Sequence, residues 1–233
     1  MELYCFSCTG NTRRAADITR EICGNSTLFA ALFPVHAQGI PRLARRQLET
    51  LPSMSGPACV ICTYGGVSPG AALSQGAAIL TRKGLTVLAA AELPDRHSYD
   101  RAAGGGRLVL PRRWEQEELE RFLRAVLAKA GGGGGAAALP CRLAPGRFFP
   151  QGALAALGTR YPRADKARCT GCMKCAAVCP AGAASGHRER CIRCAACVEV
   201  CPAGARALTF RTPVTKWYLA RGIAREKAPQ FYL

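Results

Sequence analysis

Short apolar runs alternate with helix-like segments over the first 130 residues of the chain. Four of the apolar runs have the length and composition of β-strands, and they span residues 3–6, 27–33, 58–63 and 85–91. Between and after these runs, apolar residues recur at helical spacing, which predicts helices at 12–23, 44–51, 71–82 and 115–129. Strands that alternate with helices imply crossover connections and a parallel sheet.

The third apolar run is continuous, since Ala58 to Cys62 contains no strongly polar residue. Such a strand fits a sheet that is covered on both faces. A short extra strand is expected at 108–110, and the glycines at 104–106 make this end of the sheet irregular. The expected fold class is therefore α/β, with a doubly wound parallel sheet that is shortened at its end.

Composition changes sharply at Gly131–Gly135, which is five glycines in a row, and such runs form flexible linkers. We expect four segments, with a short helix near Leu154 in the second of them. They are an α/β domain at 1–130, a Gly/Ala/Pro-rich connector at 131–165, a cysteine-rich domain at 166–210 and a basic tail at 211–233.

An internal repeat with an offset of 22 residues carries eight of the fourteen cysteines. Each copy has the spacing C-x2-C-x2-C-x3-C-P, and soft thiolates at such spacing are ligands for iron–sulfur clusters. A zinc site is the alternative, but structural zinc is commonly held by two separated pairs of ligands. The eight residues are Cys169, Cys172, Cys175, Cys179, Cys191, Cys194, Cys197 and Cys201.

This segment resembles the bacterial-type dicluster ferredoxins, a small α+β fold. The resemblance implies two [4Fe–4S] clusters and crossed ligation, in which the fourth cysteine of each run binds the other cluster. Cluster one is then held by Cys169, Cys172, Cys175 and Cys201. Cluster two is held by Cys191, Cys194, Cys197 and Cys179.

The first strand runs into a loop of hydroxyl, amide and glycine residues, and a helix follows at once. The free N–H groups of a helix N-terminus suit a phosphate group. The loop lacks both the Walker ending and the G-x-G-x-x-G pattern of dinucleotide sites. The alternative is an ordinary capped turn. The loop residues are Ser7, Cys8, Thr9, Gly10, Asn11 and Thr12.

The loop resembles the phosphate loop of flavodoxins, which implies FMN as its ligand. In that family two further loops contact the flavin ring, and here they follow the third and fourth strands. The resemblance implies stacking on the ring by Tyr64 or Tyr99, and the flavodoxin strand order places the third strand beside the first. His97 either bonds the ring or faces solvent, and the sequence favours solvent. The third-strand loop is Thr63, Tyr64, Gly65 and Gly66.

The chain as a whole resembles a family in which a flavodoxin-like domain is fused to a C-terminal dicluster ferredoxin domain. Six cysteines lie outside the repeat, and free cysteine is usually a small buried residue, so a redox pair beside the flavin is the less favoured alternative. These six are Cys5, Cys8, Cys23, Cys59, Cys62 and Cys141.

The net charge is +17, and 26 of the 32 basic residues are arginine, a pattern that a GC-rich genome also produces. An acidic redox partner is the alternative reason for this charge. Nucleic acid is disfavoured because no helix-turn-helix, zinc-finger or aromatic-stacking signature accompanies the charge. No apolar run reaches the roughly 18 residues of a membrane span, so a cytoplasmic protein is expected.

The favoured function is electron transfer between two [4Fe–4S] clusters and FMN. The alternative is a flavin-dependent reductase of a small substrate that receives electrons through the ferredoxin domain. A third hypothesis is a binding module without flavin. The sequence offers no evident acid–base pair, so it leaves enzyme activity undecided and names no substrate, and the oligomeric state is open.

Overall fold

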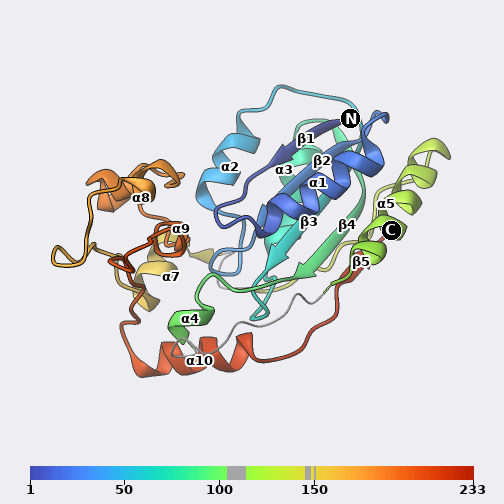
Figure 1. Cartoon of the computed structure of the whole chain (residues 1–233). Helices are drawn as coiled ribbons and strands as arrows, with labels where there is room; N and C mark the ends of the chain where they lie inside the picture. Colours follow the sequence, from blue (N-terminus) through green and yellow to red (C-terminus); the bar gives the residue numbers. More distant parts are fainter. Residues whose placement is uncertain (104–113, 145–147, 150) are drawn as a thin grey trace.

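The first half of the chain forms a largely parallel sheet, which confirms the expected α/β class (Figure 1). The structure is a computed structural model and describes residues 1–103, 114–144, 148–149 and 151–233. The strand order is β1-β2-β3-β4-β5, and only β5 is antiparallel to its neighbour. The strands are β1 (Glu2–Cys5), β2 (Phe29–Pro34), β3 (Gly56–Tyr64), β4 (Leu85–Pro94) and β5 (Gln230–Tyr232).

Helices cover both faces of the sheet. One face packs against α1 (Asn11–Cys23) and α5 (Gln116–Gly131), and the other packs against α2 (Arg42–Glu49) and α3 (Ala72–Arg82). All four strands and all four helices predicted from the apolar pattern are present, within three residues at each end. The extra strand expected at 108–110 lies outside the described residues.

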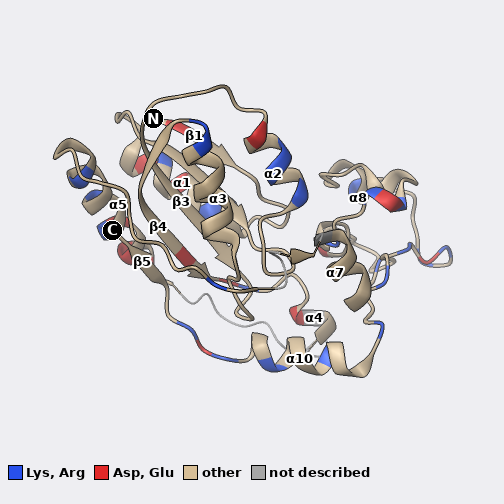
Figure 2. Cartoon of the chain, turned by 180° about the vertical axis from the view of Figure 1, so that it is seen from behind, with Lys and Arg blue, Asp and Glu red and all other residues tan. Residues whose placement is uncertain are grey.

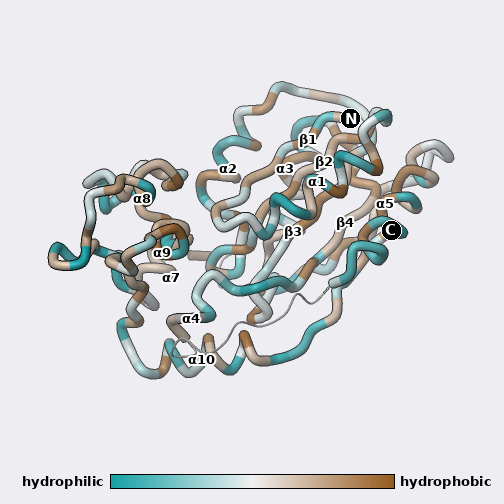
Figure 3. The backbone as a smooth tube through the Cα atoms, in the orientation of Figure 1, coloured by the Kyte–Doolittle hydropathy of each residue, from teal (hydrophilic) through white to brown (hydrophobic). Residues whose placement is uncertain are grey.

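The alternation of β2 shows how one strand serves two cores. Phe29, Ala31 and Phe33 face α2 and α3, whereas Ala30 and Leu32 face α1 and α5. Apolar stretches therefore run along the strands, while the outer surfaces of the helices are more polar (Figure 3). Burial on both faces explains why the strand is continuously apolar.

The strand order differs from the flavodoxin order that the resemblance implies. β3 pairs with β2 and β4, and β1 is an edge strand, so the expectation that the third strand lies beside the first is wrong. Burial gives the physical reason. β2 is apolar on both faces and takes a central place, whereas β1 carries Glu2 and Tyr4 and is only partly buried.

The first two crossover connections have opposite hands. Both step in the same direction across the sheet, from β1 to β2 and from β2 to β3, yet α1 and α2 cover opposite faces. One of the two therefore departs from the right-handed rule for parallel strands. The change of face also leaves a crevice at the carboxyl ends of β1 and β2, which is where open α/β sheets bind ligands.

The second half of the chain forms a lobe of short helices beside the carboxyl-terminal edge of the sheet (Figure 1). The helix expected near Leu154 is present as α7. In the described residues no helix is both long and apolar enough to span a bilayer. The lobe and its flanks contain α4 (Asp100–Ala103), α7 (Gln151–Gly158), α8 (Lys174–Ala177), two 3-10 turns at Ala183–Ser185 and Arg188–Arg190, α9 (Ala196–Glu199) and α10 (Pro213–Ile223).

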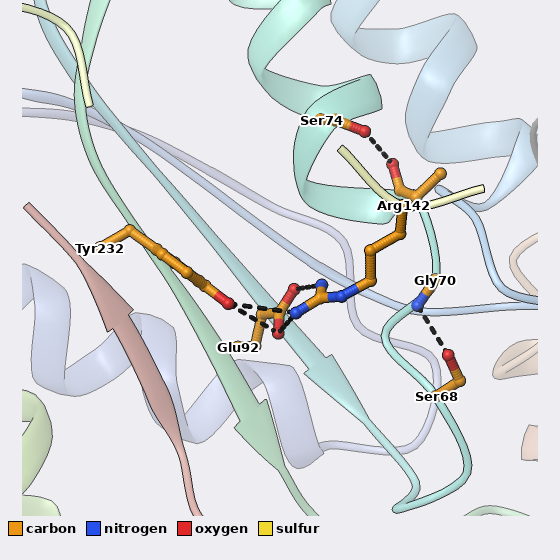
Figure 4. A network of polar contacts seen from close by, with 7 residues as sticks. Ser68, Gly70, Ser74, Glu92, Arg142 and Tyr232 are labelled. Carbon is orange, nitrogen blue, oxygen red and sulfur yellow. Dashed lines mark hydrogen bonds and ion pairs between the residues drawn. The ribbon is translucent and has the colours of Figure 1, made fainter. Parts of the chain in front are cut away.

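The C-terminal segment returns to the sheet after α10. β5 pairs with β4 through Tyr232 and Phe231, opposite Ala90 and Ala91. The buried carboxylate of Glu92 on β4 receives two hydrogen bonds from the guanidinium of Arg142 and one from the Tyr232 hydroxyl at 3.3 Å (Figure 4). One buried acid thus binds both the connector and the C-terminal strand.

Replacing Arg142 with alanine is expected to destabilise the protein by about 3 kcal/mol, because it leaves a buried charge unpaired. Adding Glu92→Gln should recover more than half of that loss. Urea unfolding of the anaerobic protein, followed by the fluorescence of buried Trp114, measures both effects. Arg20→Ala, at an exposed ion pair with Asp17, is the control and should cost less than about 1 kcal/mol. Equal effects of Arg142→Ala and Arg20→Ala would contradict the assignment.

Candidate functional site

The two cysteine runs adopt the same tight backbone conformation. In each run the residue before the second cysteine and the residue after it have positive φ. These are Gly171 (70°) and Met173 (57°) in the first run, and Arg193 (58°) and Ala195 (63°) in the second. Three of the four carry a side chain, for which this conformation is strained. Because the same strained conformation occurs in both runs, the two runs share a loop shape as well as a cysteine spacing.

Four cysteines from both runs surround one small cavity of about 20 Å³. Three come from the second run and one from the end of the first, and a cluster would require these loops to separate slightly. The donor set is the one that a cluster prefers, namely four soft sulfur ligands around one point. The four are Cys179, Cys191, Cys194 and Cys197.

The other four cysteines lie toward solvent. Cys169 and Cys172 are exposed, and Cys175 and Cys201 are partly buried. Backbone N–H groups lower the pKa of Cys172 and of Cys201, which favours the thiolate that binds metal. Within the described residues no three Cys, His, Asp or Glu side chains converge as one metal ion would require. This absence concerns sites for a single metal ion, because the four ligands of an iron–sulfur cluster each bind a different iron.

The second cysteine loop packs against the carboxyl edge of the sheet. Ile192, Cys194 and Ala196 belong to the same apolar cluster as the face of the sheet that α2 and α3 cover. Cys8 of the loop after β1 donates a hydrogen bond to Cys194. That bond raises the pKa of Cys8 and lowers the pKa of Cys194. The first helix loop and the second cysteine loop are therefore in direct contact.

Polar contacts fix the same interface. Arg96, after β4, forms an ion pair with Glu199 of α9. The Tyr99 hydroxyl donates to the carbonyl oxygen of Arg193, and Arg42 Nη2 donates to the carbonyl of Arg190 at 3.2 Å. The lobe is thus held where the carboxyl ends of the parallel strands meet.

Most of the expected phosphate-loop residues gather at a cavity of about 50 Å³ on this edge. That volume holds about four water-sized groups, which is enough for a phosphate. Cys8, Thr9, Asn11 and Thr12 line it, as do Thr63, Tyr64 and Gly65; the other four predicted residues, Ser7, Gly10, Gly66 and Tyr99, are not among its lining.

Several of the loop side chains already have partners within the protein. The Ser7 hydroxyl accepts a hydrogen bond from the Arg13 amide at 3.2 Å, and the Thr12 and Thr63 hydroxyls share one of 2.7 Å. Asn11 donates to the Arg96 carbonyl at 2.7 Å. Helix α1 begins after Gly10, at φ 91°, without a side-chain cap. An anion bound in this cavity would therefore meet backbone N–H groups and Thr9 more than the other side chains of the loop.

A larger cavity of about 280 Å³ adjoins the first and lies between the sheet edge and the cysteine lobe. Of the predicted site residues, Tyr64, Gly65 and Tyr99 line it, and Ile192 and Arg193 close it from the second cysteine loop. Six residues line both cavities, so the two are neighbours with a shared wall. They are Val35, His36, Tyr64, Gly65, His97 and Ser98.

Two histidines sit where the cavities join, and the sequence predicted neither as a buried group. Burial lowers the pKa of His36 and of His97 to about 4, so both are neutral near pH 7. His36 Nδ1 is buried and has no hydrogen-bond partner among the described residues. The His97 ring packs on Gly65, where any side chain would overlap it. His97 is half-buried and lines both cavities, whereas the sequence favoured solvent. His36 lies two residues after the carboxyl end of β2, which is the signal that could have identified it.

The two aromatic residues expected to stack on a flavin already have protein contacts. The Tyr99 ring lies 5.0 Å from that of His97 and 6.3 Å from that of Phe210. Tyr64 is buried, and the Lys227 ammonium lies 5.7 Å from the centre of its ring. Both residues still line the larger cavity.

Half of the six cysteines outside the repeat are buried. Cys23, Cys59 and Cys62 are buried, whereas Cys141 is exposed. Cys59 and Cys62 face opposite sides of the sheet, which rules out a pair between them. Burial raises the pKa of both thiols, so both stay protonated.

Two segments of the lobe match family sequence models, both described as 4Fe-4S binding domain. The matched residues are 161–184 and 187–207. No curated protein matches the chain, and no solved structure does.

The C-terminal region therefore carries two 4Fe–4S binding domains. They imply two [4Fe–4S] clusters, electron transfer through them and, in general, a redox partner. Neither match extends into the α/β sheet. The iron–sulfur prediction is confirmed, and the flavin stays a prediction.

Proposed function

We propose that the chain passes electrons between two [4Fe–4S] clusters and an FMN bound at the carboxyl edge of the sheet. The observation that carries the proposal is the cavity of about 280 Å³ between this edge and the second cysteine loop. Small-molecule sites are mostly apolar clefts of roughly 300–1,000 Å³ with a few polar groups, and this cavity is close to that range.

The two neighbouring cavities suit the two ends of FMN. The phosphate would lie at the start of α1, where backbone N–H groups and Thr9 surround the smaller cavity. The ring would lie in the larger cavity, against Tyr64 and Gly65. His36 lines this space, and its Nδ1 is a buried polar atom without a hydrogen-bond partner among the described residues.

The ligand sets proposed for the clusters give them different positions. Cluster one takes Cys169, Cys172, Cys175 and Cys201, and its loop is exposed. Cluster two takes Cys191, Cys194, Cys197 and Cys179, and its loop borders the flavin cavity. Electrons would therefore pass between a partner and the flavin through cluster one and then cluster two.

A flavin exchanges one or two electrons, whereas each cluster exchanges one, so a chain that holds both can connect one-electron and two-electron partners. The residues of the interface would keep the two sites close. Ile192 and Ala196 exclude water from the contact, and Arg96 orients the lobe through Glu199. An electron carrier is favoured over a reductase because the larger cavity has room for about one ring system.

Thr9→Glu should weaken FMN binding about tenfold or more, because it places a carboxylate beside the phosphate. Riboflavin, which lacks the phosphate, should bind wild type and variant alike. Equilibrium dialysis or flavin fluorescence quenching measures both ligands. Thr27→Glu, exposed at the opposite edge of the sheet, is the matched control. Wild-type protein that binds no FMN at saturating concentration would contradict the flavin proposal.

Exchange of single cysteines for serine tests the crossed ligation. Cys179→Ser and Cys201→Ser should each lose about half of the iron, because each removes one ligand of one cluster. The Cys201→Ser protein keeps the buried cluster, so its remaining iron should resist a chelator. The Cys179→Ser protein keeps the exposed cluster and should lose iron quickly. Reversed chelator sensitivities would show that each run binds its own cluster.

A further inference from the structure

The cysteine lobe carries more net positive charge than the first 103 residues of the chain, on about half the length. Residues 159–212 contain ten basic and three acidic residues, whereas residues 1–103 contain ten basic and seven acidic ones. The arrangement of these charges on the lobe, and not their number alone, bears on a partner.

Arginines of the lobe surround an open hollow of about 850 Å³. Six arginines line it against two carboxylates, and basic segments mark the loops of this lobe in the view from behind (Figure 2). All but Arg193 are exposed. The arginines are Arg160, Arg163, Arg168, Arg188, Arg193 and Arg211, and the carboxylates are Asp165 and Glu189.

The hollow reaches the cluster loops themselves. Arg168 directly precedes Cys169, Arg193 lies between Cys191 and Cys194, and Gly204 follows Cys201 by three residues. A protein seated in the hollow would therefore come close to the ligands of both clusters. Electron-transfer complexes bury small interfaces, and opposite charges guide their formation.

We propose that this hollow docks an acidic electron-carrier protein. The proposal rests on the electron-transfer role of the clusters and is independent of the flavin. The hollow is wide, open and polar, which differs from the enclosed apolar sites of small molecules. Its charge complements a carboxylate-rich surface, and opposite fields of this kind raise association rates by 10–1,000-fold.

The test is stopped-flow reduction of the cluster-loaded protein by a pre-reduced acidic bacterial flavodoxin. At low salt, the triple variant Arg160→Glu/Arg163→Glu/Arg188→Glu should lower the second-order rate constant about tenfold or more. Arg82→Glu/Arg121→Glu/Arg124→Glu changes the net charge equally, on exposed positions outside the lobe, and should lower it about threefold or less. The wild-type rate should fall steeply with ionic strength.

Dithionite separates the possible failures. Clusters that dithionite cannot reduce would refute the proposed function itself. Clusters that dithionite reduces normally, with equal rate losses in both triple variants, would refute only the docking site. The docking site would also be refuted if the hollow variant keeps its rate with flavodoxin but loses binding to a single-stranded RNA or to anionic lipid vesicles, since the hollow would then serve another partner.

Arg206 is buried in the lobe. Its guanidinium donates to the carbonyl oxygen of Pro162 at 2.8 Å and to that of Ala184 at 3.0 Å. It thereby joins the second 4Fe–4S domain to the first. Its Nε is buried without a hydrogen-bond partner among the described residues.

No carboxylate pairs with Arg206 among the described residues, although a buried cation is costly without a counter-charge. The side chain instead interacts with the thiols of Cys175 and Cys197, which belong to the two different ligand sets. With the clusters loaded, thiolates of both ligand sets would supply the counter-charge.

The structure assigns Arg206 as a shared counter-cation of the two clusters. It is a positioning residue, because it acts through the field at the clusters and through the backbone of both cluster loops. A cation at this place favours the reduced, more negative state of each cluster, and hydrogen bonds and net charge are known determinants of cluster potential. The two clusters should therefore be easier to reduce than they would be without it.

Redox titration of the iron-loaded protein, followed by electron paramagnetic resonance, tests this role. Arg206→Gln should disfavour one-electron reduction of at least one cluster about tenfold, which corresponds to a shift of about 59 mV. Arg206→Lys keeps the charge, and its cluster potentials should stay near those of wild type. This comparison remains informative if the Arg206→Gln variant loses iron. Arg121→Gln, exposed on α5 outside the lobe, is the control. A Lys variant with a tenfold loss, or a fully loaded Gln variant with unchanged potentials, would refute the assignment.

Discussion

The apolar contact between the second cysteine loop and the carboxyl edge of the sheet determines how the two halves of the chain cooperate. Ile192, Cys194 and Ala196 are part of the core that also contains residues of β2, β3 and β4. Parallel strands end at one edge, so all their connecting loops are available to meet the lobe there. The cavity lined by His36 and Arg193 exists only because this contact brings both sides together.

The two cysteine runs share a conformation but differ in the residues between the cysteines, and this difference sets their places. Thr170 and Lys174 of the first run correspond to Ile192 and Ala196 of the second. The polar pair is exposed and the apolar pair is buried against the sheet. The sequence therefore already contains the distinction between an outward and an inward cluster loop, although only the structure shows what the inward loop packs against.

Local patterns predicted what depends on neighbours in sequence. Helical spacing identified α1 and α5, and cysteine spacing identified the 4Fe–4S domains. The strand order could not be predicted from local patterns. Whether β1 or β2 takes the central place in the sheet depends on burial in the assembled sheet. The same holds for the buried polar groups. His36 and Glu92 become interpretable only when segments far apart in the chain meet around them.

The contacts of Glu92 help to hold the cysteine lobe against the sheet. The chain leaves the sheet after α5, and Arg142 of the connector bonds to Glu92 before the lobe begins. After the lobe, β5 returns beside β4, and Tyr232 bonds to the same carboxylate. The lobe is therefore tied to the sheet at both of its ends, which keeps its local concentration at the carboxyl edge high. Contacts such as the Arg96–Glu199 pair then need only to select one orientation, not to supply the whole free energy of association.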